Sequence, residues 1–128
     1  TTEIYTLSLH DALPIYETVL TAQNTALFAI KQGILCHEVD SAARNVIQDA
    51  GYGNNFSHSL GHGVGLNVHE VPVLSPRSEY VLQAGNAVTV EPGIYLQNKF
   101  GVRIEDLVIV TEDGYENLTK SNKELFVI

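Results

Sequence analysis

Three of the five histidines lie close together in one glycine-rich segment, which reads HSLGHGVGLNVHE. They are His58, His62 and His69. His58 and His62 are four positions apart, so an extended chain places both imidazoles on the same face. The glycines before His69 allow the chain to bend until the third imidazole points inward as well. The spacing predicts one shared cavity, although a single histidine beside glycines is more often a structural hydrogen-bonding residue.

Two glutamates occupy positions in the sequence that are difficult to explain as ordinary solvent-exposed residues. Glu91 directly follows the apolar run AVTV, and Glu105 interrupts the run VRIEDLVIV. A carboxylate on a buried strand must be paired, protonated or bound to a cation, because an isolated buried charge is too costly. Arg103 is one candidate for the pairing. Imidazole and carboxylate ligands together suit Mn²⁺, Co²⁺, Fe²⁺ or Zn²⁺, so the residues alone support a metal site and purely structural roles about equally.

Two helices are expected ahead of these residues. Apolar side chains recur at helical spacing from Tyr16 to Lys31, and again from about His37 to Ala50. A glycine follows each stretch closely, and glycine is a common C-terminal stop. The sequence therefore predicts two short helices in tandem.

Strands are expected in the second half of the chain. Glycines disfavour helix there, and β-branched residues gather at 88–90 and at 102–110. Turn signals fall at 84–86 and 91–93, and a third at 112–114 predicts a hairpin between 107–110 and 115–118. The order of helix, helix and strands predicts an α+β fold, with two helices followed by antiparallel strands.

Residues 1–15 fit neither pattern. The segment TTEIYTLSLHDALPI has no clean period, and Pro14 disfavours a helix that continues back through it. It resembles translated adapter or cloning sequence. We therefore expect an artefactual segment at 1–15 and a single domain, or part of one, at 16–128.

Composition excludes several classes of partner. The chain carries 15 acidic and 7 basic side chains, for a formal net charge of −8, whereas nucleic-acid binding needs a basic surface. No apolar run approaches the roughly 20 residues that cross a bilayer. The single cysteine, Cys36, fits a reducing compartment. We expect a cytoplasmic protein without nucleic-acid or membrane partners.

Three strings carry a family resemblance: HSLGHGVGLNVHEVP, VTVEPGIY and GVRIEDLVIVTEDGYENLT. In this order and spacing the chain resembles the pita-bread metallopeptidases, in the branch of Xaa-Pro dipeptidase and aminopeptidase P. The resemblance covers 16–128 and implies the C-terminal portion of a pita-bread (creatinase/aminopeptidase-like) domain. It also implies metal-dependent hydrolysis of the Xaa-Pro bond at the N-terminus of dipeptides or peptides.

The resemblance implies specific ligands for two divalent ions, Mn²⁺ or Co²⁺ first, with Zn²⁺ or Fe²⁺ as alternatives. His62 and Glu91 match metal ligands, and Glu105 matches a glutamate that bridges both ions. Two metal ions that share a water lower its pKa and polarise the scissile carbonyl. The position of Glu91 also matches a residue that shuttles the proton.

Four further residues match positions around the metal pair. His58 and His69 match histidines that contact the substrate or stabilise the oxyanion, and Arg103 matches a residue that fixes the bridging glutamate. Tyr95 is expected to line the substrate site. Together they make up the expected catalytic and substrate-binding set.

The sequence departs from the family at its start. Complete members supply two further aspartate ligands before the first helix, and the only aspartate at 1–15 is Asp11, which matches neither in context. Three protein ligands of five remain, so this polypeptide is expected to be inactive or nearly so by itself. A homodimer is a further expectation for the complete protein.

Four alternatives compete with this assignment, and the sequence favours each of them less. Creatinase-like hydrolases use the same fold without a metal pair, and methionine aminopeptidases are a second peptidase class. A non-catalytic pita-bread module that binds peptides or proteins is the leading alternative outside enzymes. A cupin-like metal barrel would need paired His-x-His ligands, which the sequence lacks.

Overall fold

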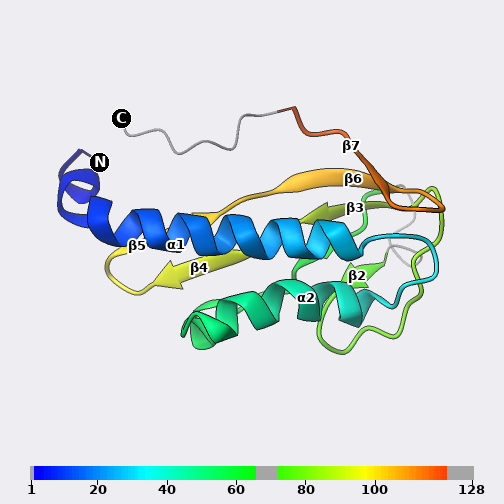
Figure 1. Ribbon diagram of the computed structural model, residues 1–128, viewed down its shortest axis with the longest axis horizontal. Helices are drawn as coiled ribbons and strands as arrows, with labels where there is room; N and C mark the ends of the chain where they lie inside the picture. The colour runs from blue at the N-terminus through cyan, green and yellow to red at the C-terminus, as the bar shows by residue number, and fades with distance from the viewer. Residues whose placement is uncertain (1, 66–71, 121–128) are drawn as a thin grey trace.

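The two helices form an antiparallel hairpin that packs against the strands (Figure 1). The computed structural model describes residues 2–65 and 72–120, with residues 2–11 given by their backbone alone. Helix α1 spans Thr2–Ala29 and helix α2 spans Cys36–Asp49. Among these described helices, none combines the length and the apolar character needed to cross a bilayer. The predicted order of two helices followed by antiparallel strands is confirmed.

Helix α1 begins much earlier than Tyr16, so the predicted start of the first helix is wrong. Pro14 lies inside the helix. Proline removes one backbone N–H and crowds the preceding turn. Pro14 is on the exposed side of α1, where water can bond the carbonyl left without a donor, while the next residue, Ile15, is only 1% exposed. Burial of the helix side that carries Ile15 outweighs the local preference of Pro14 against helix. The proposed division at residue 15 stays a prediction.

In the part of the chain that the structure describes, seven short strands follow the helices, after a turn of 3-10 helix at Gly53–Asn55. The strands are β1 Gly61–His62, β2 Val73–Leu74, β3 Ala87–Val90, β4 Gly93–Leu96, β5 Phe100–Arg103, β6 Asp106–Val110 and β7 Tyr115–Asn117. They pair in the orders β1-β2, β3-β6-β7 and β4-β5, always antiparallel. The predicted hairpin around 112–114 is confirmed as β6 and β7.

One long hairpin contains β3 and β4 in its first arm and β5 and β6 in its second. β3 pairs with β6 up to Val90, opposite Asp106, and β4 pairs with β5 from Gly93 onward. Two residues on each arm separate the two ladders, 91–92 and 104–105. The ladders keep the same register across this gap.

That shared register decides which residues face each other in the gap. Counting inward from either ladder brings Glu91 opposite Glu105 and Pro92 opposite Ile104. The Ile104 N–H donates to the Pro92 carbonyl over 3.3 Å, as this pairing requires. The two glutamates are therefore cross-strand neighbours.

One sequence prediction is wrong in this region. Residues 91–93 form no turn, and the β-branched run 102–110 contains two strands separated at 104–105. Pro92 has no N–H to give to the ladder, so it interrupts pairing while the chain stays extended. The turn lies instead at 97–99, where Asn98 has a positive φ of 61°.

Side chains along this hairpin point alternately to a core face and to a second face. The core face carries apolar side chains packed into the interior: Ile94, Leu96, Phe100, Val102 and Ile104. The second face carries Glu91, Gly93, Tyr95, Gly101, Arg103 and Glu105. This period of two places every candidate residue of the hairpin on the same side.

Strand β1 is joined to the free side of β3. An isolated bridge pairs Gly63 with Val88, and the Glu91 N–H donates to the Leu60 carbonyl over 2.7 Å. A Cβ built at Gly61 would collide with the backbone oxygen of Thr89. The absence of a side chain at Gly61 thus lets the histidine segment lie directly against β3.

Gly61→Ala should therefore destabilise the fold, because β1 must move away from β3 to relieve the collision. We expect a loss of about 1–3 kcal/mol in urea unfolding. Gly65→Ala is the matched control, since a Cβ there meets open space, and it should change stability by less than about 0.5 kcal/mol. Equal stability of the two variants would contradict the packing described.

Cys36, the first residue of α2, gives a second prediction. Burial raises the pKa of its thiol from 9.0 to about 11, and a hydrogen bond with Ser78 only partly opposes this increase. The thiol ionises more readily in the unfolded chain, so its contribution to stability is intact below about pH 9 and lost as pH rises through about 11. Urea unfolding at rising pH should show a larger loss in the wild type than in Cys36→Ala. Identical losses would refute this assignment.

Candidate metal centre

The pair Glu91 and Glu105 forms one side of the candidate site. Directly opposite residues of an antiparallel pair point to the same face, with Cβ atoms about 4.5–5.5 Å apart. Glu91 is partly buried, whereas Glu105 is exposed and lies in the gap between β5 and β6. The expectation that both carboxylates project from buried strands is therefore wrong for Glu105. Two like charges so placed repel each other, and a divalent cation between them would remove that repulsion.

His62 reaches the same face from β1. The hydroxyl of Thr89 accepts a hydrogen bond from the His62 N–H over 3.0 Å, which holds the two residues opposite each other. Glu91 is then the diagonal neighbour of His62, and diagonal neighbours share a face. The Nε2 atom of His62 lies 3.7 Å from a carboxylate oxygen of Glu91.

The hydrogen bond at the other ring nitrogen determines the tautomer of His62. Its Nδ1 lies 3.0 Å from the Gly63 carbonyl oxygen, which can only accept. Nδ1 therefore carries the hydrogen, and in the neutral imidazole Nε2 keeps a lone pair on the side of Glu91. Metal-ligating histidines commonly donate their second N–H to a carbonyl in this way. His62 and Glu91 thus fit a divalent metal ion as ligands.

The three predicted ligands are arranged side by side but do not close into a complete site. Among the side chains that the structure describes, at 12–65 and 72–120, no three His, Cys, Asp or Glu residues converge closely enough to hold an ion. His62 and Glu91 meet, and Glu105 stands opposite Glu91. His69 lies outside the described residues.

A chain of hydrogen bonds joins three further predicted residues. Nδ1 of His58 donates to the Ser59 carbonyl over 2.7 Å, so its Nε2 accepts from the Tyr95 hydroxyl, also over 2.7 Å. Hydrogen bonding with Tyr95, followed by the nearby charges, raises the pKa of the Arg103 guanidinium above its ordinary value. Arg103 is exposed, and its guanidinium, like that of other arginines, is always positively charged. The sequence predicted these residues but not their linkage through Tyr95.

Two glycines provide the surface on which Tyr95 lies. A Cβ at Gly93 would collide with the Tyr95 hydroxyl, and a Cβ at Gly101 would come within 2.7 Å of the ring. Gly101 is also the cross-strand partner of Tyr95. The ring is therefore laid along the hairpin toward Arg103 and His58 rather than out into solvent.

A partly buried ion pair on α2 holds the segment that leads to His58. Asp40 is fully buried and accepts two hydrogen bonds from Arg44, at 2.8 and 3.0 Å. Arg44 also donates to the carbonyls of Phe56 and His58, while Asp40 accepts from the Leu60 N–H. Sequence reasoning missed both residues, although an acid and an arginine four apart on a predicted helix were a detectable signal.

Comparison with known proteins identifies relatives of this chain. It is 53% identical over 111 residues to a Xaa-Pro dipeptidase of Pyrococcus furiosus, matching 87% of this chain and 32% of the relative. The prolidase of Pyrococcus horikoshii OT3 superposes with a TM-score of 0.87 at 50% identity, over 91% of this chain and 34% of that one. The X-Pro aminopeptidase of Thermotoga maritima MSB8 gives a TM-score of 0.87 at 46% identity, over 92% and 34%.

These matches settle the fold and the family, although the chain spans only about a third of the length of these relatives. The α+β fold is that of the pita-bread metallopeptidases, as predicted. Residues 3–112 match the family profile described as metallopeptidase family M24. The chain therefore belongs to metallopeptidase family M24.

Proposed function

We propose that this chain supplies one wall of a dinuclear metal centre that hydrolyses Xaa-Pro peptide bonds. The observation that carries the proposal is the placement of Glu91 opposite Glu105, with Nε2 of His62 beside Glu91. The names of the relatives, Xaa-Pro dipeptidase and X-Pro aminopeptidase, support the substrate class. Both dipeptides and longer peptides with proline in second position are candidate substrates.

The metal pair, when bound, would activate a water molecule and polarise the scissile carbonyl. His62 would donate its Nε2 lone pair as a ligand, and Glu105 would be a ligand shared by both ions. Glu91 would be the second metal ligand supplied by this chain. Its carboxylate would also accept a proton from the attacking water. Mn²⁺ or Co²⁺ is our first choice, since imidazole and carboxylate ligands suit either ion.

The hydrogen-bonded chain on the same face would orient the substrate. Because Tyr95 donates to Nε2 of His58, that ring is fixed in one tautomer and one orientation. We assign His58 to contact with the substrate carbonyl or the developing oxyanion, with His69 as its companion. Arg103, next to Glu105 along the same face, would hold the bridging carboxylate in place.

Three ligands fall short of the set that a dinuclear centre needs, so this chain alone should bind metal weakly and turn over little substrate. The two further carboxylates of the family site would come from outside 16–128. A homodimer remains part of the proposal for the whole protein. We also propose a cytoplasmic location, because the one cysteine is buried and unpaired.

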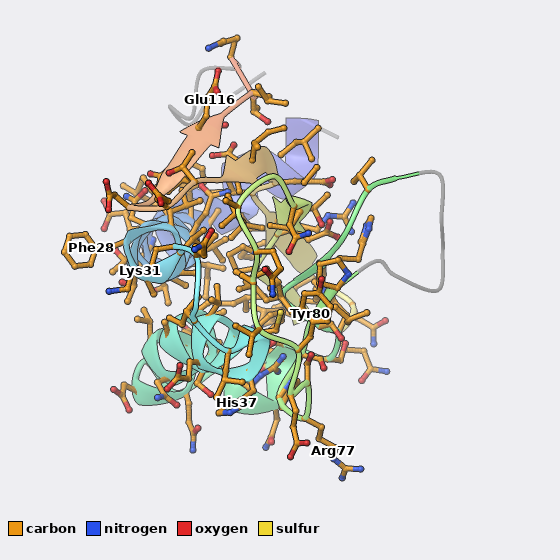
Figure 2. The ribbon with its side chains drawn as sticks, turned by 90° about the vertical axis from the view of Figure 1, so that its right-hand side faces the viewer. Phe28, Lys31, His37, Arg77, Tyr80 and Glu116 are labelled. Atoms are coloured by element: carbon orange, nitrogen blue, oxygen red, sulfur yellow. The ribbon has the colours of Figure 1, made fainter. Side chains whose placement is uncertain are left out.

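A metal titration tests the ligand assignment. His62→Ala should weaken Co²⁺ binding to the 128-residue chain by at least about tenfold in calorimetry. His37→Ala is the control, since His37 lies on α2 (Figure 2) and is not among the residues of the candidate site. Equal loss in both variants, or none in His62→Ala, would remove His62 from the site.

A graft tests the reaction. Residues 16–120 would replace the matched segment of the Pyrococcus furiosus dipeptidase, to which the chain is 53% identical. The graft should hydrolyse an Xaa-Pro dipeptide with Mn²⁺ or Co²⁺, and Glu105→Gln in the graft should lower kcat/KM by about 100-fold. The 128-residue chain alone should show no metal-stimulated turnover. An inactive but folded graft would count against the proposed activity.

Tyr95→Phe in the same graft tests the orienting chain. Loss of one hydrogen bond to His58 should reduce kcat by about 3- to 10-fold, with little change in stability. Tyr115→Phe is the matched control, because Tyr115 is an exposed residue of β7. If Tyr95→Phe retains full kcat, the hydroxyl has no part in orienting His58.

A further inference from the structure

Gln23 is a buried polar residue outside the candidate site. It lies on α1 and is fully buried, on the helix face that enters the core with Val19, Ala22 and Ala26. Its Nε2 atom donates to two backbone carbonyls, those of Val90 and Ile104, each over 3.2 Å. A single amide nitrogen thus reaches both arms of the long hairpin.

The hairpin needs an external donor at this point. Ile104 and Pro92 are partners, and the Ile104 N–H donates to the Pro92 carbonyl. The reciprocal bond of such a pair would run from N–H of residue 92 to the Ile104 carbonyl. Proline has no N–H, so Ile104 receives nothing from its partner. Gln23 supplies the missing donor from the helix.

The two carbonyls that Gln23 binds belong to the residues directly before the two glutamates. Val90 precedes Glu91, and Ile104 precedes Glu105. The glutamates are opposite each other, and their like charges push the two arms apart at a position that lacks a ladder hydrogen bond. A donor bonded to both arms opposes that separation.

We propose that Gln23 is a positioning residue, a clasp that fixes the distance between the Glu91 and Glu105 carboxylates for metal binding. This inference rests on the proposed function, because it takes both glutamates as ligands. Gln23 touches neither the metal ions nor the substrate. It acts through the backbone of the two strands and from the opposite side of the hairpin.

Gln23→Met tests the clasp, because methionine keeps the length of the side chain and removes both donors. Val19→Ala is the control, a buried change on the same helix that leaves the two carbonyl bonds intact. Hydrogen exchange of the Ile104 amide in the 128-residue chain should be about tenfold faster in Gln23→Met than in Val19→Ala, after correction for global stability.

Metal binding gives the second readout. Gln23→Met should weaken Co²⁺ binding by about tenfold, whereas Val19→Ala should leave it unchanged. In a Glu105→Gln background the effect of Gln23→Met should disappear, because one of the two positioned carboxylates is gone. A merely structural role would weaken binding equally in both backgrounds.

Pro92→Ala offers a rescue that also covers a failure of Gln23→Met to fold. It returns an N–H to residue 92, which can then donate to the Ile104 carbonyl in place of Gln23. The double variant should fold and slow the Ile104 exchange back toward the wild-type rate. Absence of rescue would overturn the explanation through the missing proline donor.

The two readouts separate this proposal from the proposed function. Unchanged Ile104 exchange in Gln23→Met overturns the clasp, whatever the metal affinity. If exchange accelerates but the wild-type chain binds no Co²⁺, Gln23 still holds the arms together, and the metal-site assignment is what fails. Faster exchange with unchanged Co²⁺ binding would overturn the positioning role.

Discussion

The gap in the long hairpin is the constraint around which the candidate site is organised. Pro92 cannot donate to Ile104, and the ladder between the two arms is interrupted over two pairs, 91/105 and 92/104, before it resumes in the same register. That continuity sets Glu91 against Glu105 on the face opposite the core. The two candidate ligands therefore lie next to a position where the ladder lacks one hydrogen bond. Gln23 on α1 supplies the replacement donor.

Polar contacts around this gap fix side chains from distant parts of the sequence. Thr89 binds the backbone of His62, while Asp40 and Arg44 on α2 hold the segment that carries His58. Each of these contacts satisfies a backbone group as well as placing a side chain, so the packing of the fold and the geometry of the site depend on the same bonds. The helices therefore act as supports for the strand face and not only as a cover for its core.

Much of the fold and part of the site follow from local patterns. The helical period predicted α2 closely, and the turn at 112–114 predicted the hairpin of β6 and β7. The helix through Pro14 and the turn at Asn98 were not predicted, since burial of the helix face and pairing of the strands outweigh the local preference there. Glu105 was expected on a buried strand because a run of apolar letters does not reveal where pairing is interrupted.

By itself, the sequence determined the residue types that can do chemistry, their glycine-rich surroundings and the family they resemble, because these depend on composition and spacing along the chain. Tertiary structure alone decided that Glu91 faces Glu105, that Nε2 of His62 points toward Glu91, and that Tyr95 connects His58 to Arg103. Register and ring orientation come from hydrogen bonds between segments far apart in sequence. Such bonds form only once the helices and strands have packed, so no local pattern encodes them.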